Sequence, residues 1–158
     1  MTRLYAFTLA TAVAASMACA ADEPAEPLAF GSVTTAGDIE LDSFRWQARP
    51  IVVFADTPAD PRFQQQLSML EAEIDRLAER DVVILTDTDP DAQGPIRTSL
   101  RPRGFQVAVV AKDGTVVLRK PFPYSVREIT RTIDKTPLRE QEVRDRRAER
   151  HREGATSE

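Results

Sequence analysis

The stretch Pro50–Leu70, PIVVFADTPADPRFQQQLSML, places a buried strand, a short loop and the start of an amphipathic helix in direct succession. Ile51–Ala55 is a continuous apolar run rich in β-branched residues, which is typical of a parallel strand covered on both faces. Asp60-Pro61 then starts a helix, because Asp accepts hydrogen bonds from the first free amides and a proline there loses none. The stretch therefore predicts a strand-to-helix junction of an open α/β sheet.

The helix that begins at Pro61 is predicted to continue to Ala78. Apolar side chains recur along it at intervals of three and four residues and form one buried stripe; they are Leu67, Leu70, Ile74, Leu77 and Ala78. Val82–Leu85 follows as a second buried strand. Strand, helix and strand together predict a right-handed parallel crossover unit.

The next part of the chain predicts a short helix, an antiparallel hairpin and a closing helix. Pro95–Leu100 is the short helix, and Phe105–Ala111 is the third strand. Lys112-Asp113-Gly114 turns the chain into a fourth strand, because Asp-Gly suits the positive backbone angles of a hairpin. Ser125 and Glu128 form a capping box at the start of the last helix, and Pro137 marks its end. The predicted class is α/β, a three-layer sandwich in the order β-α-β-α-β-β-α that resembles the minimal thioredoxin core.

Composition predicts one folded domain and three accessory segments within the 158 residues. Arg3, an apolar stretch and the small-x-small sequence Ala18-Cys19-Ala20 are typical of a secretory signal. The predicted segments are a signal peptide at 1–20, a flexible leader at 21–38, a thioredoxin-like domain at 39–138 and a charged tail at 139–158. The tail is Arg-, Glu- and Asp-rich, and we expect it to be partly helical or disordered.

Cys19 is the only cysteine of the sequence. Cleavage after Ala20 discards it, whereas the less favoured alternative, a lipoprotein signal, leaves it lipidated. The folded domain is cysteine-free in both cases. We expect the protein to be periplasmic or secreted, with no transmembrane segment after removal of the signal, because the apolar run is too short to span a membrane.

Three stretches resemble the bacterial family called domain of unknown function 4174: FRWQARPIVVFADTPADPRFQQQL, VAVVAKDGTVVLRK and IDKTPLREQEVR. They lie between Leu41 and Arg144. This family is similar to the peroxiredoxin-like domain of certain secreted matrix proteins, so the resemblance implies a thioredoxin-like fold outside the cytoplasm. It supplies no established reaction. Thioredoxin carries a Cys-x-x-Cys pair at its strand-to-helix junction, where this sequence has Thr57-Pro58-Ala59-Asp60.

The absence of a thiol decides which chemistry the junction can perform. Disulfide exchange and peroxide reduction need a thiolate nucleophile, so we predict no catalytic residue, cofactor or metal. The candidate binding residues are Thr57, Asp60, Arg62, Lys112 and Arg139. Free amides at the helix start, with Thr57 and Arg62, offer a site for a small anion, and the hairpin of Lys112 is expected beside it. The alternative is that Asp60 occupies these amides as a cap and Arg62 is solvated.

These features predict a non-redox binding or structural module whose partner is an unknown protein or a small anionic ligand of the cell envelope. The net charge of -4 comes from interspersed acids and bases, which predicts no nucleic-acid partner. The alternative is an extracytoplasmic enzyme, peroxidase-like or hydrolytic, that uses polar residues of the junction loop.

Three other patterns carry less weight. Asp87–Asp91 resembles the opening of a calcium loop, but Ala92 and Thr98 stand where that loop needs Gly and Glu. His151 is the only histidine and lies in the polar tail. Phe44 and Trp46 are predicted to pack over the sheet, and the alternative is an exposed aromatic pair at a partner site.

Overall fold

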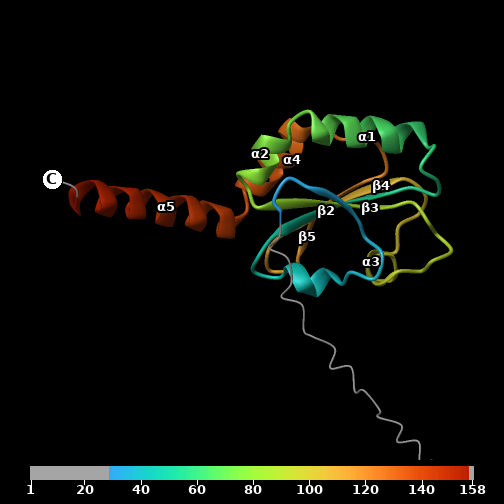
Figure 1. The fold of residues 1–158 in the computed structure, drawn as a ribbon, viewed down its shortest axis with the longest axis horizontal. Helices are drawn as coiled ribbons and strands as arrows, with labels where there is room; N and C mark the ends of the chain where they lie inside the picture. The colour runs from blue at the N-terminus through green and yellow to red at the C-terminus, as the bar shows by residue number, and fades with distance from the viewer. Residues whose placement is uncertain (1–28, 157–158) are drawn as a thin grey trace, which may run out of the picture.

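The computed structural model describes residues 29–156, so the predicted signal peptide and Cys19 lie outside the described residues. A five-stranded sheet in the order β1-β3-β2-β4-β5 forms its centre (Figure 1). The strands are β1 Val33–Thr35, β2 Arg49–Phe54, β3 Val82–Asp87, β4 Gln106–Val110 and β5 Val116–Lys120. β3 pairs in parallel with β1 and β2, whereas β4 is antiparallel to β2 and β5. The predicted parallel unit followed by an antiparallel hairpin is therefore confirmed.

Helices cover both faces of this sheet (Figure 1). One face carries α1, Pro61–Glu71, with α2, Ile74–Ala78, and α4, Val126–Asp134. The other carries the 3-10 helix Leu41–Phe44 and α3, Pro95–Leu100. α5, Pro137–Thr156, projects from one end of the sandwich. The three-layer α/β prediction is confirmed.

Two hydrophobic clusters explain why the central strands read as continuous apolar runs. Along β2, Ile51 and Val53 face the cluster under α1, α2 and α4, whereas Val52 and Phe54 face the cluster under α3. Every residue of β2 is buried. A strand that is covered on both sides has no polar face, so its sequence does not alternate.

The prediction of a flexible leader at 21–38 is wrong for its last part. Val33–Thr35 forms the edge strand β1 in parallel register with β3, with Val33 opposite Ile84. The Gly31 amide also donates to the Val82 carbonyl at 2.8 Å. The three side chains of β1 are exposed, so this strand is held by backbone hydrogen bonds, which leave no apolar pattern in the sequence.

The helix predicted to run from Pro61 to Ala78 is interrupted. α1 ends at Glu71, and Glu73 has backbone angles of φ -126° and ψ 34° before α2 begins. Gly31, at φ +79°, approaches α2 so closely that an added Cβ would lie 3.1 Å from Ile74 and 3.2 Å from Ala78. The short α2 and the entry to β1 are thus packed together at the edge of the sheet.

The C-terminal boundary of the domain also differs from the prediction. Pro137 is the first residue of a new helix, α5, a position that proline favours because its missing amide would have no helical partner. Arg139 is only 6% exposed, so the start of the charged tail belongs to the packed domain. The remainder of α5 up to Thr156 is helical and projects away from the sandwich (Figure 1).

Candidate functional site

The β2–α1 junction holds three of the five predicted binding residues. Asp60 caps α1: its Oδ1 accepts from the Arg62 amide at 2.8 Å. The Arg62 guanidinium donates back to the same carboxylate, from Nε at 3.1 Å and from Nη2 at 2.7 Å. Thr57 Oγ1 accepts from the Ala59 amide at 3.3 Å. The Arg62 guanidinium also lies 5.2 Å from the ring centre of Phe105. The side chains of the junction therefore make most of their polar contacts with one another.

The electrostatics of the junction follow from this pairing. The hydrogen bond from Arg62 is the main cause that lowers the pKa of Asp60, and the same bond raises the pKa of Arg62. A carboxylate already sits where a bound anion would meet the first amides of α1. The geometry matches the capping alternative of the sequence analysis, and a binding role for Thr57, Asp60 and Arg62 stays a prediction.

Behind the junction lies a buried ion pair that sequence reasoning missed. Arg97 of α3 is 7% exposed and donates from Nε to both oxygens of Asp87 at 3.0 Å. Its Nη2 also donates to the Ala55 carbonyl at 3.0 Å. The pair ties α3 to the carboxyl ends of β2 and β3. The available signal was an arginine among the apolar residues of a short helix that follows an acidic strand end.

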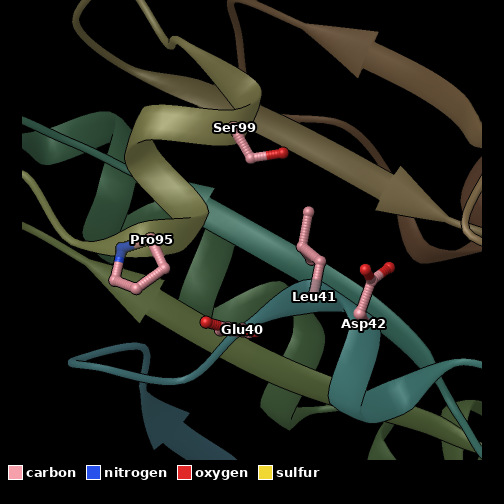
Figure 2. A pocket seen from close by; sticks show the side chains of 5 residues that line it. All are labelled: Glu40, Leu41, Asp42, Pro95 and Ser99. Carbon is pink, nitrogen blue, oxygen red and sulfur yellow. The ribbon is translucent and has the colours of Figure 1, made fainter.

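Two shallow hollows adjoin α3. One, of about 350 Å³, is lined by Asp56, Pro90, Gln93, Arg97, Thr98, Arg101 and Pro102. The other, of about 200 Å³, lies between the 3-10 helix and α3, and Figure 2 shows Glu40, Leu41 and Asp42 facing Pro95 and Ser99 across it. Ser99 is not near the single histidine, His151, which belongs to α5 at the other side of the molecule (Figure 1). Ser99 and His151 therefore do not form a catalytic pair.

Lys112 and Arg139 lie at the opposite end of the sheet from the junction. β4 is antiparallel to β2, with Val109 opposite Ile51, so the hairpin that follows β4 meets the beginning of β2. The expectation that the Lys112 hairpin lies beside the Thr57–Arg62 loop is wrong for this reason. The five candidate residues divide into two groups that cannot share one small ligand.

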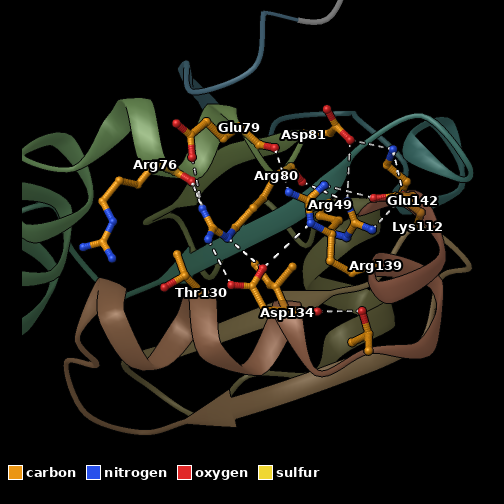
Figure 3. Close-up of polar contacts among 12 residues, drawn as sticks. Arg49, Arg76, Glu79, Arg80, Asp81, Lys112, Thr130, Asp134, Arg139 and Glu142 are labelled. Atoms are coloured by element: carbon orange, nitrogen blue, oxygen red, sulfur yellow. Dashed lines mark hydrogen bonds and ion pairs between the residues drawn. The ribbon is translucent and has the colours of Figure 1, made fainter. Parts of the chain in front are cut away.

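At the end of the sheet where β2 begins, Glu142 of α5 is the centre of a charged cluster (Figure 3). Its Oε1 accepts from Arg49 Nη2 at 2.8 Å and lies 3.2 Å from Lys112 Nζ, and its Oε2 accepts from Arg139 at 3.2 Å. Burial raises the pKa of Glu142, but the hydrogen bond from Arg49 and the neighbouring cations outweigh it and the pKa is lowered.

The cluster extends to the turn before β3 and to α4 (Figure 3). Lys112 Nζ donates to Asp81 at 2.8 Å, and Arg80 makes two bonds of 2.9 Å to Asp134. Arg49 is 1% exposed and also donates to the Arg80 carbonyl at 2.9 Å. These charges pair with one another, so the cluster joins the hairpin, the sheet, α4 and α5.

Trp46 departs from the prediction that it packs over the sheet. Phe44 is buried as expected, but Trp46 is 65% exposed. Its backbone is left-handed at φ 63°, and its amide donates to the Lys112 carbonyl at 2.7 Å. Trp46 forms one wall of a groove of about 500 Å³. We call this the Trp46 groove; it is lined by Trp46, Ala111, Asp113, Thr115, Val117, Thr136, Pro137, Leu138, Gln141 and Arg144.

Comparison with known families agrees with the architecture. The profile of the family described as Domain of unknown function (DUF4174) matches residues 40–142. The chain belongs to the DUF4174 family. The matched range begins just before the 3-10 helix and ends at Glu142, so it includes the first turns of α5. The resemblance found in the sequence is confirmed.

Solved structures similar to this DUF4174 chain include two peroxiredoxins. Prx1a of Plasmodium yoelii has 16% identity and a TM-score of 0.49, covering 64% of this chain and 80% of that one. The mitochondrial 2-Cys peroxiredoxin of Plasmodium falciparum has 17% identity and a TM-score of 0.45, covering 60% and 78%. No curated protein matches the sequence.

Within residues 29–156, no group of three or more His, Cys, Asp or Glu side chains is placed to hold a metal ion. In the acidic turn after β3, Asp89 Oδ1 accepts from the amides of Asp91 and Ala92, and Asp87 is paired with Arg97. No helix in the part of the chain that the structure describes has the length and apolar character to cross a bilayer.

Proposed function

We propose that this DUF4174 protein is an exported, non-redox binding protein. The observation that carries the proposal is the β2–α1 junction, where Thr57, Pro58, Ala59 and Asp60 take the place of a reactive thiol. Asp60 and Arg62 neutralise each other there. Neither side chain is a nucleophile that could replace a thiolate in peroxide or disulfide chemistry.

Two ion pairs hold the two ends of the sheet rigid, and a rigid sheet supports a binding role for the loops that it carries. The Arg97–Asp87 pair fixes one end of the sheet, and the Arg49–Glu142 pair fixes the other. Loops held by such a sheet present fixed surfaces, and recognition is often carried by loops of this kind. The secretory pattern of residues 1–20, which places Cys19 beside the expected cleavage site, supports export.

The proposal is tested first by activity. The purified, export-processed chain is incubated with hydrogen peroxide, and separately with a model disulfide, in the presence of excess thiol reductant. We expect no turnover above the protein-free rate. Sustained turnover that Asp60→Ala abolishes would instead support the enzyme alternative at the junction loop.

Export and binding need separate measurements. N-terminal sequencing of the exported chain should give Ala21 as the first residue, whereas a lipidated Cys19 would indicate the lipoprotein route. The tagged chain should retain one defined partner from its own envelope fraction at moderate salt. Arg62→Ala tests the junction as the contact surface: if it leaves the fold and the capture unchanged, the Thr57–Arg62 loop is not that surface. Absence of any saturable partner would overturn the binding function.

A further inference from the structure

We infer that the larger of the two hollows beside α3 binds a free α-amino acid, whose ammonium group meets Asp56 and whose carboxylate meets Arg97 and Arg101. We call this hollow the Asp56–Arg101 hollow. The site goes beyond the proposed function, because its ligand is a small zwitterion and not a protein. Its volume of about 350 Å³ lies at the lower end of the range of about 300 to 1,000 Å³ that is usual for ligand pockets.

The hollow lies at the carboxyl ends of the parallel strands β2 and β3. Asp56 stands two residues after the end of β2, and the carbonyl of its neighbour Ala55 accepts from Arg97 Nη2 at 3.0 Å. Arg97 is also bound to Asp87, the last residue of β3. Figure 1 shows α3 at the same end of the sheet as the beginning of α1. Open α/β sheets usually bind their ligands at this end, so the location favours a binding site.

Arg97 offers the hollow a hydrogen-bond donor that is already held in place. Its side chain is 7% exposed, and the ring centre of Phe54 lies 5.4 Å from its guanidinium. Nε and Nη2 are used by Asp87 and by the Ala55 carbonyl, so within residues 29–156 Nη1 is the guanidinium nitrogen without a hydrogen bond. Because Arg97 lines the hollow, Nη1 can donate to a carboxylate there without a rearrangement.

Arg101 brings a second guanidinium to the same hollow. It lies one turn after Arg97, and its amide donates to the Arg97 carbonyl at 2.8 Å. Its backbone is left-handed, at φ 47° and ψ 58°, which is uncommon for a residue other than glycine and is often found at functional sites. The Arg101 side chain is exposed and pairs with no carboxylate of the described residues. Its charge is therefore available to a ligand.

Asp56 is the one acidic residue among those that line the hollow. Its carboxylate lies against the loop after α3, since a Cβ added to Gly104 would lie 3.6 Å from Asp56 Oδ2. In the part of the chain that the structure describes, this carboxylate makes no hydrogen bond or ion pair, and none joins it to Arg101. An unpaired carboxylate and an unpaired guanidinium thus line one hollow without neutralising each other.

The charges of the lining balance, and this balance selects the ligand. Asp87 neutralises Arg97, which leaves Asp56 and Arg101 with opposite charges. A ligand that carries both an ammonium and a carboxylate satisfies both residues. A simple anion would instead meet the carboxylate of Asp56 in the same hollow, and that contact is unfavourable.

The other charged side chains near the hollow are paired or lie outside its lining. Arg62 is paired with Asp60. The side chains outside the lining carry both signs; they are Asp89, Asp91 and Arg103. They add no strong field of one sign, so the choice of ligand depends on the lining itself.

The rest of the lining favours a small or polar amino acid. It consists of Gln93 and Thr98, which are polar, and of Pro90 and Pro102, which restrict the two loops beside α3. A large apolar side chain would find no matching surface there. We therefore expect glycine, serine, asparagine or glutamine as ligands, in preference to leucine or phenylalanine.

Isothermal titration calorimetry of the purified, export-processed chain with glycine, L-serine, L-asparagine and L-glutamine tests the site. We expect saturable binding of at least one of them. The amide of that amino acid lacks the carboxylate, and its N-acetyl derivative lacks the ammonium. Each derivative should bind about tenfold more weakly, because each leaves one charged group of the hollow without its partner.

Matched variants assign the two charges of the ligand to their partners. Arg101→Gln should weaken the amino acid about tenfold, whereas Arg103→Gln, an exposed change outside the lining, should alter the affinity by less than about twofold. Asp56→Asn should weaken the amino acid by a similar factor but leave the weaker binding of the N-acetyl derivative unchanged. Asp91→Asn is its matched control and should leave both affinities unchanged.

Arg101→Gly excludes a folding defect as the cause of lost binding. Glycine adopts the left-handed conformation of this position without steric cost. The variant should therefore keep the thermal unfolding curve of the wild type while it loses the same affinity as Arg101→Gln.

Several results would overturn the inference. They are no saturable binding of any of the four amino acids, equal affinity for the amide and the free amino acid, or equal losses for Arg101→Gln and Arg103→Gln. Tighter binding of inorganic phosphate than of any amino acid would assign the hollow to a simple anion and would also overturn it. Turnover in the redox assays would remove the proposed function but leave this binding result intact, so the two failures are distinguishable.

Discussion

At the residue scale, the start of α1 depends on one carboxylate, which both caps the helix and forms an ion pair. Asp60 accepts the backbone amide of Arg62 and pairs with its guanidinium. The first contact requires an oxygen acceptor at the N-cap, whereas the second requires the negative charge. Substitutions can therefore separate capping from charge pairing, because asparagine keeps the acceptor and loses the charge.

We predict that Asp60→Ala lowers the melting temperature by a few degrees at neutral pH, that Asp60→Asn has an intermediate effect and that Arg62→Ala has the smallest. The pKa of Asp60 in the folded chain lies below its usual value of 3.8. Its contribution is therefore present above that value and is lost as the pH falls through the lowered pKa. Thermal melts from pH 7 to pH 2 should show the difference between wild type and Asp60→Ala disappear at the acidic end. A difference independent of pH would contradict the charge pairing.

At the element scale, α5 depends on its first turns for attachment to the domain. Leu138 lies in the groove wall, Arg139 is buried and donates to the Glu79 carbonyl at 3.1 Å, and Glu142 bonds to Arg49. From Arg144 to Gly154 every side chain is exposed. A polar helix without a packed face gains little from its surroundings, so its orientation is set by the few residues at its base.

We predict that Glu142→Gln destabilises the chain by about 2 kcal/mol, because it leaves the buried Arg49 without its closest carboxylate. Glu140→Gln, an exposed change on the same helix, should cost less than about 0.5 kcal/mol. Urea unfolding at neutral pH measures both. Because the pKa of Glu142 is lowered from 4.5, its contribution is lost as the pH falls below that value. Equal effects of the two substitutions would show that the cluster does not anchor α5.

At the scale of the whole molecule, the sequence predicted features that depend on neighbouring residues better than contacts between residues far apart in the chain. The apolar run of β2, the Asp60-Pro61 helix start and the Asp113-Gly114 turn each depend on neighbouring residues, and all three are present. Arg49 and Glu142 are 93 residues apart in the sequence, and charged side chains are normally exposed, so their buried pairing had no signal. The separation of Lys112 from the junction depends on strand direction, which no single segment contains.

We predict that the rate of amide hydrogen exchange will differ between the layers of the molecule. Amides in the packed central strands exchange only when a large part of the domain unfolds. The amides of β2, β3 and β4 should exchange slowest, and those of α5 beyond Arg144 within the first seconds despite their helical bonds. Strong protection of the projecting part of α5 in the isolated chain would contradict an unpacked helix and would indicate that another copy already covers it.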